Sequence, residues 1–316
     1  MSTPTATRAA WLQIHFCVLL WGFTAILGKL ISLPSLPLVW WRMLIVVVLL
    51  LMLPRVWRGL RLMTPRLRWS YAGVGALVAL HWLTFYASIK LSNASVGATC
   101  MALSSVFTAL VEPLLTGRRI SKRELLLGMA VLPGVALVVG GVPDGMHAGI
   151  IVGACSALFV AFFSTLNKRL SDHGDALAVT AIELGGGTLL LSMLAPVTAL
   201  LSPAFGDSPF VLPDLRDALY LLTLAVACTL VPFALSLVAM RPLSAFGINL
   251  AVSLEPVYAI VLAIVLLGEQ RELSPQFYFG VAIILASVLI YPFLMRPSRV
   301  AHPELLATSE SKQVGE

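Results

Sequence analysis

Charged residues are scarce in this sequence. Only 11% of its 316 residues are Asp, Glu, Lys or Arg, whereas soluble domains carry about a quarter. Hydrophobic residues make up 59%. This composition excludes a soluble globular fold and is typical of a protein that crosses a membrane many times. The net charge of +6 does not indicate nucleic-acid binding, because the basic residues follow a membrane-topology pattern.

Cysteines and catalytic motifs are also scarce. The cysteines stand inside apolar runs and no two have metal-ligand spacing, so we expect small buried hydrophobic side chains rather than disulfides or a metal site. No Walker A sequence, Gly-x-Ser-x-Gly or His-Glu-x-x-His occurs. The sequence therefore predicts no cofactor, no metal and no direct use of ATP. The four cysteines are Cys17, Cys100, Cys155 and Cys228.

Long apolar runs are abundant, and they predict an all-α integral membrane protein with ten transmembrane helices. No connection is long enough for a folded domain; the longest are the loops 54–69 and 202–216. The first run lacks a signal-peptide cleavage site, so we interpret it as a retained helix. The expected segments are roughly 11–31, 36–53, 70–89, 92–115, 124–142, 148–166, 176–201, 217–240, 245–267 and 276–295.

Basic residues are concentrated in alternate connections, which predicts the orientation. With a cytoplasmic N-terminus, the outer ends hold only Lys29, Lys90, Arg216 and Arg271, and most other Lys and Arg residues face the cytoplasm. This bias predicts a multi-pass protein of the cell inner (plasma) membrane with both termini cytoplasmic. The loop 54–69, which is rich in Arg and carries two Trp, is expected to contact lipid headgroups.

A weak internal repeat relates the two halves of the chain. An offset of 151 residues places Ala94 on Ala245 and Gly117 on Gly268. We therefore predict two five-helix repeats, 11–142 and 148–295, followed by a cytoplasmic tail, 296–316. Because five is odd, the second repeat enters the membrane from the opposite face. Transporters with such inverted repeats bind substrate near the bilayer midplane.

Several motifs resemble the drug/metabolite transporter superfamily, EamA-type branch. They are Leu20-Trp21-Gly22-Phe23 with Lys29, then Arg42, and the run from Ser253-Leu254-Glu255-Pro256-Val257 to Leu266-Leu267-Gly268-Glu269. The resemblance implies a ten-helix bundle with cytoplasmic termini that exports small metabolites such as amino acids. The first half departs from the pattern, with Ser104-Ser105 at the Glu-Pro position and Arg118 in place of the final glutamate.

Glu255 is the first candidate site residue. It precedes Pro256 about 15 Å into its helix, at ~1.5 Å per residue, near the midplane, where a charge is costly. Pro256 leaves the carbonyl of Val252 without its helical partner, which predicts a kink. Glu255 either takes up a proton or a substrate amine, or holds the kinked helix through a neighbouring hydroxyl or cation.

Arg42 and His81 are the next candidates. The Arg42 guanidinium matches a substrate carboxylate, or it reaches the outer interface beside Trp40 and Trp41. His81 suits a proton relay because histidine titrates near neutral pH, or it is a hydrogen-bonded core residue. It lies in an aromatic run that includes Trp82, Phe85 and the candidate residue Tyr86, whose rings could stack on a substrate.

The remaining candidates each have a functional and a structural interpretation. Glu183 precedes three glycines, 185–187, which either pack closely against another helix or form a flexible gate beside the acid. Lys29 lines a pocket or anchors the outer surface. Trp21, Asn249 and Tyr258 line a pocket or belong to the core.

These features favour a secondary transporter that exports a small amphipathic metabolite such as an amino acid by alternating access, rather than an enzyme. The expected partners are a small-molecule substrate and the lipid bilayer, with no nucleic acid; proton-coupled and facilitative mechanisms both fit.

Import of similar metabolites and multidrug efflux remain alternatives. An integral membrane enzyme acting on a lipid-like substrate is the alternative from another class, but the intramembrane charges lie at different depths, which disfavours a catalytic cluster. The sequence does not determine the oligomeric state.

Overall fold

The fold consists of helices. The computed structural model describes residues 4–117, 126, 129–170, 174–198, 200, 202–232, 235 and 254–294. Within them, every one of the ten apolar segments contains a helix and no strand occurs, so the all-α prediction is confirmed. The first half contains α1 (Pro4–Leu30), α2 (Ser35–Leu51), α3 (Pro54–Leu62), α4 (Pro65–Leu91), α5 (Ala94–Met101), α6 (Leu103–Thr116) and α8 (Leu132–Gly140). The second half contains η1 (Asp144–Met146), α9 (His147–Leu170), α10 (Ala176–Thr198), α11 (Leu215–Ala225), η2 (Val226–Leu230), α14 (Glu255–Leu262), η3 (Ala263–Leu267), η4 (Glu269–Arg271) and α15 (Pro275–Leu294).

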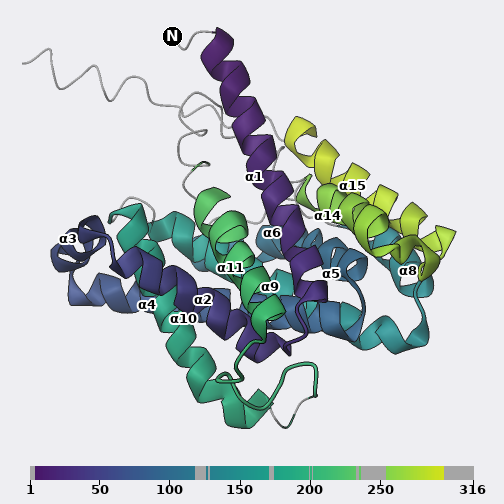
Figure 1. The fold of residues 1–316 in the computed structure, drawn as a ribbon. Helices are drawn as coiled ribbons and strands as arrows, with labels where there is room; N and C mark the ends of the chain where they lie inside the picture. The colour runs from purple at the N-terminus through teal and green to yellow at the C-terminus, as the bar shows by residue number, and fades with distance from the viewer. Residues whose placement is uncertain are drawn as a thin grey trace, which may run out of the picture.

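The helices pack in the pairs expected for inverted repeats. The first helix of the first half, α1, packs against α14, which lies fourth in the second half. In the same way α9, first in the second half, packs against α5 and α6, which lie fourth in the first. The second helices α2 and α10 contact each other, as do the fifth helices α8 and α15 at one edge of the bundle (Figure 1). Exchanging the two halves therefore preserves the pattern of contacts.

Helix lengths fit a membrane. Among the described residues, five helices are long and apolar enough to span a bilayer by themselves, and the bent pair α2 and α3 passes the same test. The apolar helix 255–267, formed by α14 and η3, is shorter and lies beside a part of the chain outside the described residues. The Val252 carbonyl and the predicted kink before Pro256 also lie there, and Pro256 stands in the first turn of α14.

The connection at 54–69 differs from the predicted loop. Residues 54–62 form α3, which turns by 91° from α2 and lies at the side of the bundle opposite α8 and α15 (Figure 1). Val56 and Gly59 face the protein, while Trp57 is half exposed. Arg55 forms a salt bridge of 2.8 Å with Asp175, at the start of α10. A short helix with basic and aromatic residues on its outer face is suited to the membrane interface.

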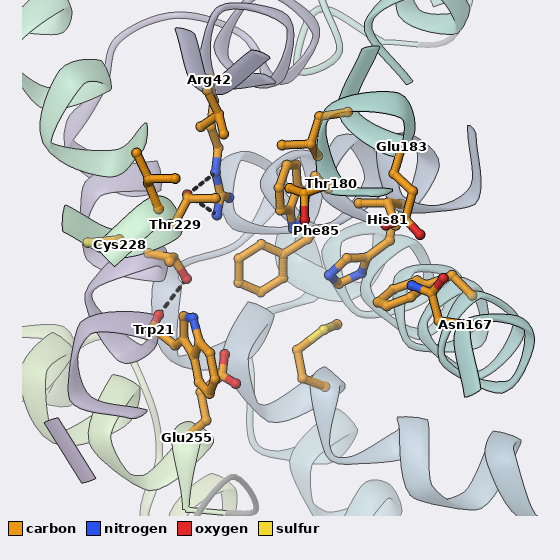
Figure 2. A pocket seen from close by; sticks show the side chains of 18 of the residues that line it. Trp21, Arg42, His81, Phe85, Asn167, Thr180, Glu183, Cys228, Thr229 and Glu255 are labelled. Atoms are coloured by element: carbon orange, nitrogen blue, oxygen red, sulfur yellow. Dashed lines mark hydrogen bonds between the residues drawn. The ribbon is translucent and has the colours of Figure 1, made fainter. Parts of the chain in front are cut away.

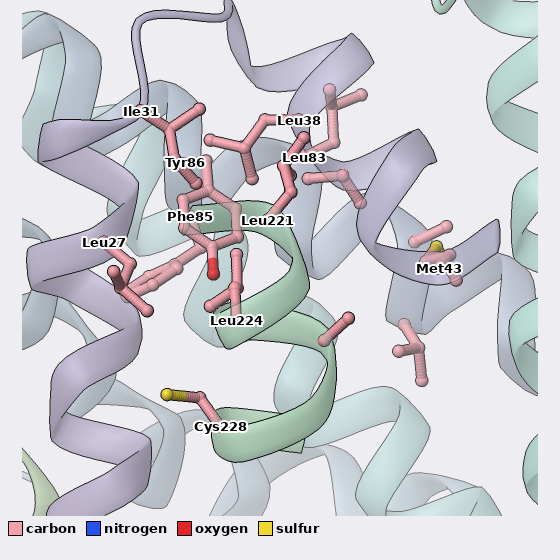
Figure 3. Close-up of a cluster of buried hydrophobic side chains, with 14 of the residues drawn as sticks. Leu27, Ile31, Leu38, Met43, Leu83, Phe85, Tyr86, Leu221, Leu224 and Cys228 are labelled. Carbon is pink, nitrogen blue, oxygen red and sulfur yellow. The ribbon is translucent and has the colours of Figure 1, made fainter. Parts of the chain in front are cut away.

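A large apolar core extends through the bundle. At one end it combines side chains from the end of α1, the start of α2, the last turns of α4, and α11 (Figure 3). We call this end of the bundle, where α1 and α4 finish and α5 and α11 begin, the Lys29 end. The opposite end, where α2 finishes and α10 begins, is the Arg55 end. Buried members of the core include Ile31, Leu38, Met43, Leu83, Leu221 and Leu224.

Three of the four cysteines are buried, as predicted, but Cys155 is exposed on α9. The prediction is wrong there because an apolar run in a membrane helix has a lipid-facing side as well as a protein-facing side. Cys155 lies within a candidate membrane span, 144–167. Hydrophobic character alone therefore does not distinguish burial in protein from contact with lipid.

Small residues allow α4 and α10 to cross in close contact. A Cβ atom on Gly75 would lie 1.8 Å from the backbone oxygen of Glu183, and one on Gly187 would lie 2.7 Å from the backbone oxygen of Gly75. Gly186 faces Ala72 in the same interface, whereas Gly185 has no neighbour within 4 Å. Two of the three consecutive glycines therefore serve helix packing, and the crossing fixes the position of Glu183.

Substitution of Gly75 by alanine should strongly destabilise the bundle. The added methyl group would force α4 and α10 apart, and overpacking of this kind costs about 3 kcal/mol. We expect Gly75→Ala to lower the thermal midpoint of the detergent-solubilised protein by several degrees. Gly73→Ala on the same helix is the control, because a Cβ there meets nothing within 4 Å. Equal midpoints for the two variants would contradict the close crossing.

Candidate functional site

A cavity of about 490 Å³ lies inside the bundle. Side chains from α1, α2, α4, α5, α9, α10, η2 and α14 line it, so both repeats contribute to its wall. Its volume falls in the range of pockets for small molecules, and it combines aromatic walls with a few polar groups. Figure 2 shows Arg42 and Glu183 on opposite sides, Glu255 on a third side, and Phe85 between them.

The cavity extends from the middle of the bundle towards the Arg55 end. Leu50, Asn167 and Thr180 line it, and each stands within about a turn of the end of its helix at that side. At the Lys29 end, buried side chains of the apolar core such as Ile31, Leu221 and Leu224 pack together. A solute in the cavity is thus separated from the Lys29 end by packed side chains.

Arg42 is held rigidly against the cavity wall. Its Nε and Nη2 donate to the Thr229 hydroxyl at 3.1 and 2.9 Å, and its Nη1 donates to the Tyr86 hydroxyl at 2.7 Å. The guanidinium carbon lies 3.8 Å from the centre of the Trp82 ring, a cation–π arrangement. The Arg42 residue is only 4% exposed. It therefore lines the cavity and does not reach the interface beside Trp40 and Trp41.

The π-helical turn η2 explains the position of Thr229. The Thr229 hydroxyl donates to the Leu224 carbonyl at 2.8 Å, five residues earlier. Because its single hydrogen is used in this bond, its lone pairs are free to accept the two Arg42 bonds. A π-helical turn inside an α-helix frequently marks a functional site. Here the turn directs the Thr229 hydroxyl towards Arg42, a direction that a regular α-helix would not give it.

His81 is a cavity residue with a defined tautomer. The Ser156 hydroxyl donates to the His81 carbonyl at 2.8 Å, and Nδ1 of His81 lies 2.8 Å from the same hydroxyl oxygen. Because the serine hydrogen is used on the carbonyl, Nδ1–H must be the donor to Ser156. The ring packs between Phe85 and Phe163. Nε2 is therefore the nitrogen available for other contacts.

Glu183 is buried in the wall of the cavity next to Asn167. The residue is 9% exposed, and the Asn167 amide donates a hydrogen bond to its carboxylate. Both side chains lie at the same side of the cavity (Figure 2). Two acceptor atoms of this pair, Glu183 Oε1 and Asn167 Oδ1, have no hydrogen-bond partner among the described residues. Buried acceptors without partners are costly, which makes this pair the most conspicuous polar feature of the site.

Glu255 and Trp21 occupy the side of the cavity formed by α14 and α1. Both line it, and the Glu255 carboxylate lies beside the Trp21 ring (Figure 2). Among the described residues, none donates a hydrogen bond to the Glu255 carboxylate. The carboxylate is thus placed at the first turn of α14, where the helix dipole favours negative charge.

The other candidate residues have supporting or different positions. Tyr86 is fully buried and reaches the site only through its bond to Arg42. Tyr258 packs against the buried pair Ile14 and Val18 of α1, and its hydroxyl lies 3.1 Å from Nδ1 of His15. Lys29 donates to the Ser92 carbonyl at 3.2 Å, at the Lys29 end. Asn249 lies outside the described residues.

Sequence reasoning did not identify Asn167, Thr180 or Thr229. Each is an uncharged polar residue in or beside an apolar run, and helices of this kind contain many such residues that bond their own backbone. Thr180 itself donates to the Ala176 carbonyl at 2.9 Å. Only the convergence of several helices on one cavity distinguishes these residues from the rest.

Buried polar groups also tie the helices together at the Lys29 end. The Asp217 carboxylate, 2% exposed, accepts from the backbone amide of Ser32 at 2.9 and 3.1 Å and from its hydroxyl at 2.6 Å. Lys90 donates to the Ile31 carbonyl. These bonds join the end of α1 to α11 and to α4, and Lys90 satisfies a carbonyl at the end of α1.

Glu269 performs a similar role for α5. Its buried carboxylate accepts from the backbone amides of Ala94 and Ser95, both at 2.8 Å. The adjacent Asn93 donates to Glu272 at 3.0 Å. The last residue of the Leu-Leu-Gly-Glu motif therefore binds the N-terminus of a helix in the other repeat, where the helix dipole favours a negative charge.

The cavity combines charged, polar and aromatic groups. It offers a guanidinium, two carboxylates, an imidazole and aromatic surfaces, all suited to an amphipathic solute. Within the described ranges, no group of three or more His, Cys, Asp or Glu residues could hold a metal ion.

Comparison with known proteins gives a consistent result. A family model described as "EamA-like transporter family" matches residues 9–140 and again 147–295. One similar solved structure, described as "Crystal structure of protein", has a TM-score of 0.58 and 18% sequence identity, and the match covers 91% of this chain and 97% of that one. This level of identity supports the fold alone. No curated protein matches the sequence.

Replacing Thr229 by valine should remove two hydrogen bonds of Arg42 and destabilise the protein. The near-isosteric change leaves two guanidinium donors without an acceptor, and hydrogen bonds to charged groups are worth about 1.5 to 3 kcal/mol. We expect a loss of this size in the free energy of unfolding in detergent micelles. The control is Thr223→Val on α11, whose exposed hydroxyl bonds only the Leu219 carbonyl; a change within about 0.5 kcal/mol is expected there. Equal effects would contradict the assigned role of Thr229.

Proposed function

Because the chain belongs to the EamA-like transporter family, we propose that it is a secondary transporter for a small amphipathic metabolite, most plausibly an amino acid, and not an enzyme. The observation that carries this proposal is the cavity in which a buried guanidinium faces two carboxylates across aromatic side chains. A zwitterion presents opposite charges to these groups. Its apolar part fits the rings of Trp21 and Phe85.

Arg42 is suited to the carboxylate of such a substrate. Three of its five N–H donors are used on Thr229 and Tyr86, which leaves one N–H on each terminal nitrogen. Two such donors can bind the two oxygens of a carboxylate. Glu255 then accepts the substrate amine or carries a coupling proton, in agreement with the functional interpretation of its sequence position.

The proposed orientation makes the cavity a cytoplasmic loading site. The positive-inside pattern assigns the Arg55 end to the cytoplasm and the Lys29 end to the outside of the inner membrane. The cavity extends towards the Arg55 end, and the other end is filled by the apolar core. This conformation accepts substrate from the cytoplasm for export, and rocking of one repeat against the other would open the opposite side.

Reconstitution into liposomes tests the proposal. The purified protein would be supplied with labelled amino acids, nucleosides and cationic drugs, with and without a pH gradient. Accumulation of amino acids is the expected result, and stimulation by the gradient would indicate proton coupling. Movement of cationic drugs alone would favour multidrug efflux. Turnover of a lipid without movement of any solute would overturn the transporter proposal in favour of a membrane enzyme.

Glu255→Gln should abolish transport while leaving expression and thermal stability near normal. The amide keeps the size of the side chain but cannot carry the negative charge that binds an amine or takes up a proton. The control is Asp207→Asn, which removes one exposed carboxylate that does not line the cavity. The measurement is the initial rate of amino-acid uptake into proteoliposomes. Normal uptake by Glu255→Gln across the pH range would exclude a role for this carboxylate.

A further inference from the structure

The unpartnered acceptors beside Glu183 define a second part of the cavity. Asn167 uses its amide donor on the Glu183 carboxylate, and Glu183 Oε1 and Asn167 Oδ1 remain without a partner among the described residues. Thr180 stands three residues before Glu183, on the same face of α10. Its hydroxyl hydrogen is used on the Ala176 carbonyl, so its oxygen can only accept a further bond.

Resting on the proposed function, we propose that Glu183, Asn167 and Thr180 form a subsite for a primary ammonium group of the substrate. Three acceptor oxygens line this part of the cavity, and a primary ammonium has three N–H donors. One of the acceptors carries a formal negative charge when ionised, which makes the hydrogen bond to an ammonium stronger than one to a neutral donor.

The position of the subsite defines the class of substrate. Arg42 and Glu183 lie on opposite sides of the cavity, with Phe85 and His81 between them, and Glu255 lies on a third side (Figure 2). An amino acid whose carboxylate binds Arg42 and whose α-ammonium binds Glu255 therefore directs its side chain past the aromatic rings towards Glu183. The substrate inferred is an α-amino acid with an ammonium group at the end of its side chain.

The charges of the described lining residues agree with this class. They comprise one guanidinium, on Arg42, and two carboxylates, on Glu183 and Glu255. A substrate with one carboxylate and two ammonium groups complements all three. A simple zwitterion leaves the Glu183 carboxylate without an opposite charge, and a buried carboxylate of that kind is unfavourable.

A comparison of L-lysine with L-norleucine tests the inference, because norleucine has the same carbon chain without the terminal ammonium. In proteoliposomes containing the wild-type protein, lysine uptake should exceed norleucine uptake at least tenfold at equal low concentration. Glu183→Gln should reduce the lysine-to-norleucine ratio at least tenfold, and Asn167→Leu should reduce it in the same direction. Asp207→Asn should leave the ratio within twofold of the wild type.

Several results would overturn the subsite. Norleucine uptake that equals or exceeds lysine uptake in the wild type would exclude it while leaving the amino-acid transporter intact. An equal fall of both substrates in Glu183→Gln would assign Glu183 to a step common to all substrates. Uptake of both substrates that requires Na⁺ in the medium, and is lost together in Glu183→Gln, would assign the three oxygens to a metal ion. Failure of every amino acid to enter would instead reject the proposed function.

Discussion

A charged side chain is stable in the interior of this bundle only where other groups supply its hydrogen bonds, and the buried carboxylates of the described structure differ in how far this requirement is met. At the Lys29 end the buried carboxylates are fully used: Asp217 accepts three bonds from Ser32, and Glu269 accepts two backbone amides of α5. In the cavity, an oxygen of Glu183 is left without a described partner. The first arrangement stabilises helix ends, and the second is suited to a ligand.

Close packing and the site depend on the same helix crossing. The backbone of Glu183 lies against Gly75, in a contact that leaves no room for a side chain at position 75. The crossing of α4 and α10 thereby fixes the depth of the Glu183 carboxylate relative to His81 and Trp82, which belong to the same helix as Gly75. The glycines contribute to the geometry of the cavity without touching its contents.

The sequence predicted the helices and the charged cavity residues because both differ clearly from an average sequence. An apolar run of membrane length is visible without any contact, and Arg42, Glu183 and Glu255 stand out because charge is rare within such runs. Asn167 and Thr229 did not stand out, because uncharged polar residues are ordinary in membrane helices. Ser32 and Asp217 meet across 185 positions of the chain, and no local pattern encodes such a contact. The short basic helix α3 was missed because it has only 9 residues and is rich in arginine, so it has no apolar run of membrane length.

The bonds at the Lys29 end divide into two groups that matter for the proposed alternating access. Those between Ser32 and Asp217, and between Glu269 and the start of α5, join one repeat to the other. Those from Lys29 to Ser92 and from Lys90 to Ile31 remain within the first repeat. Rocking of one repeat against the other must break the first group and can preserve the second. When these bonds break, each carboxylate becomes exposed to the water that enters the opening pathway. Hydration of the carboxylate then offsets the loss of its hydrogen bonds. The hydrogen-bonded charges at the Lys29 end are therefore compatible with its opening. An apolar core alone would gain nothing from hydration when this end opens.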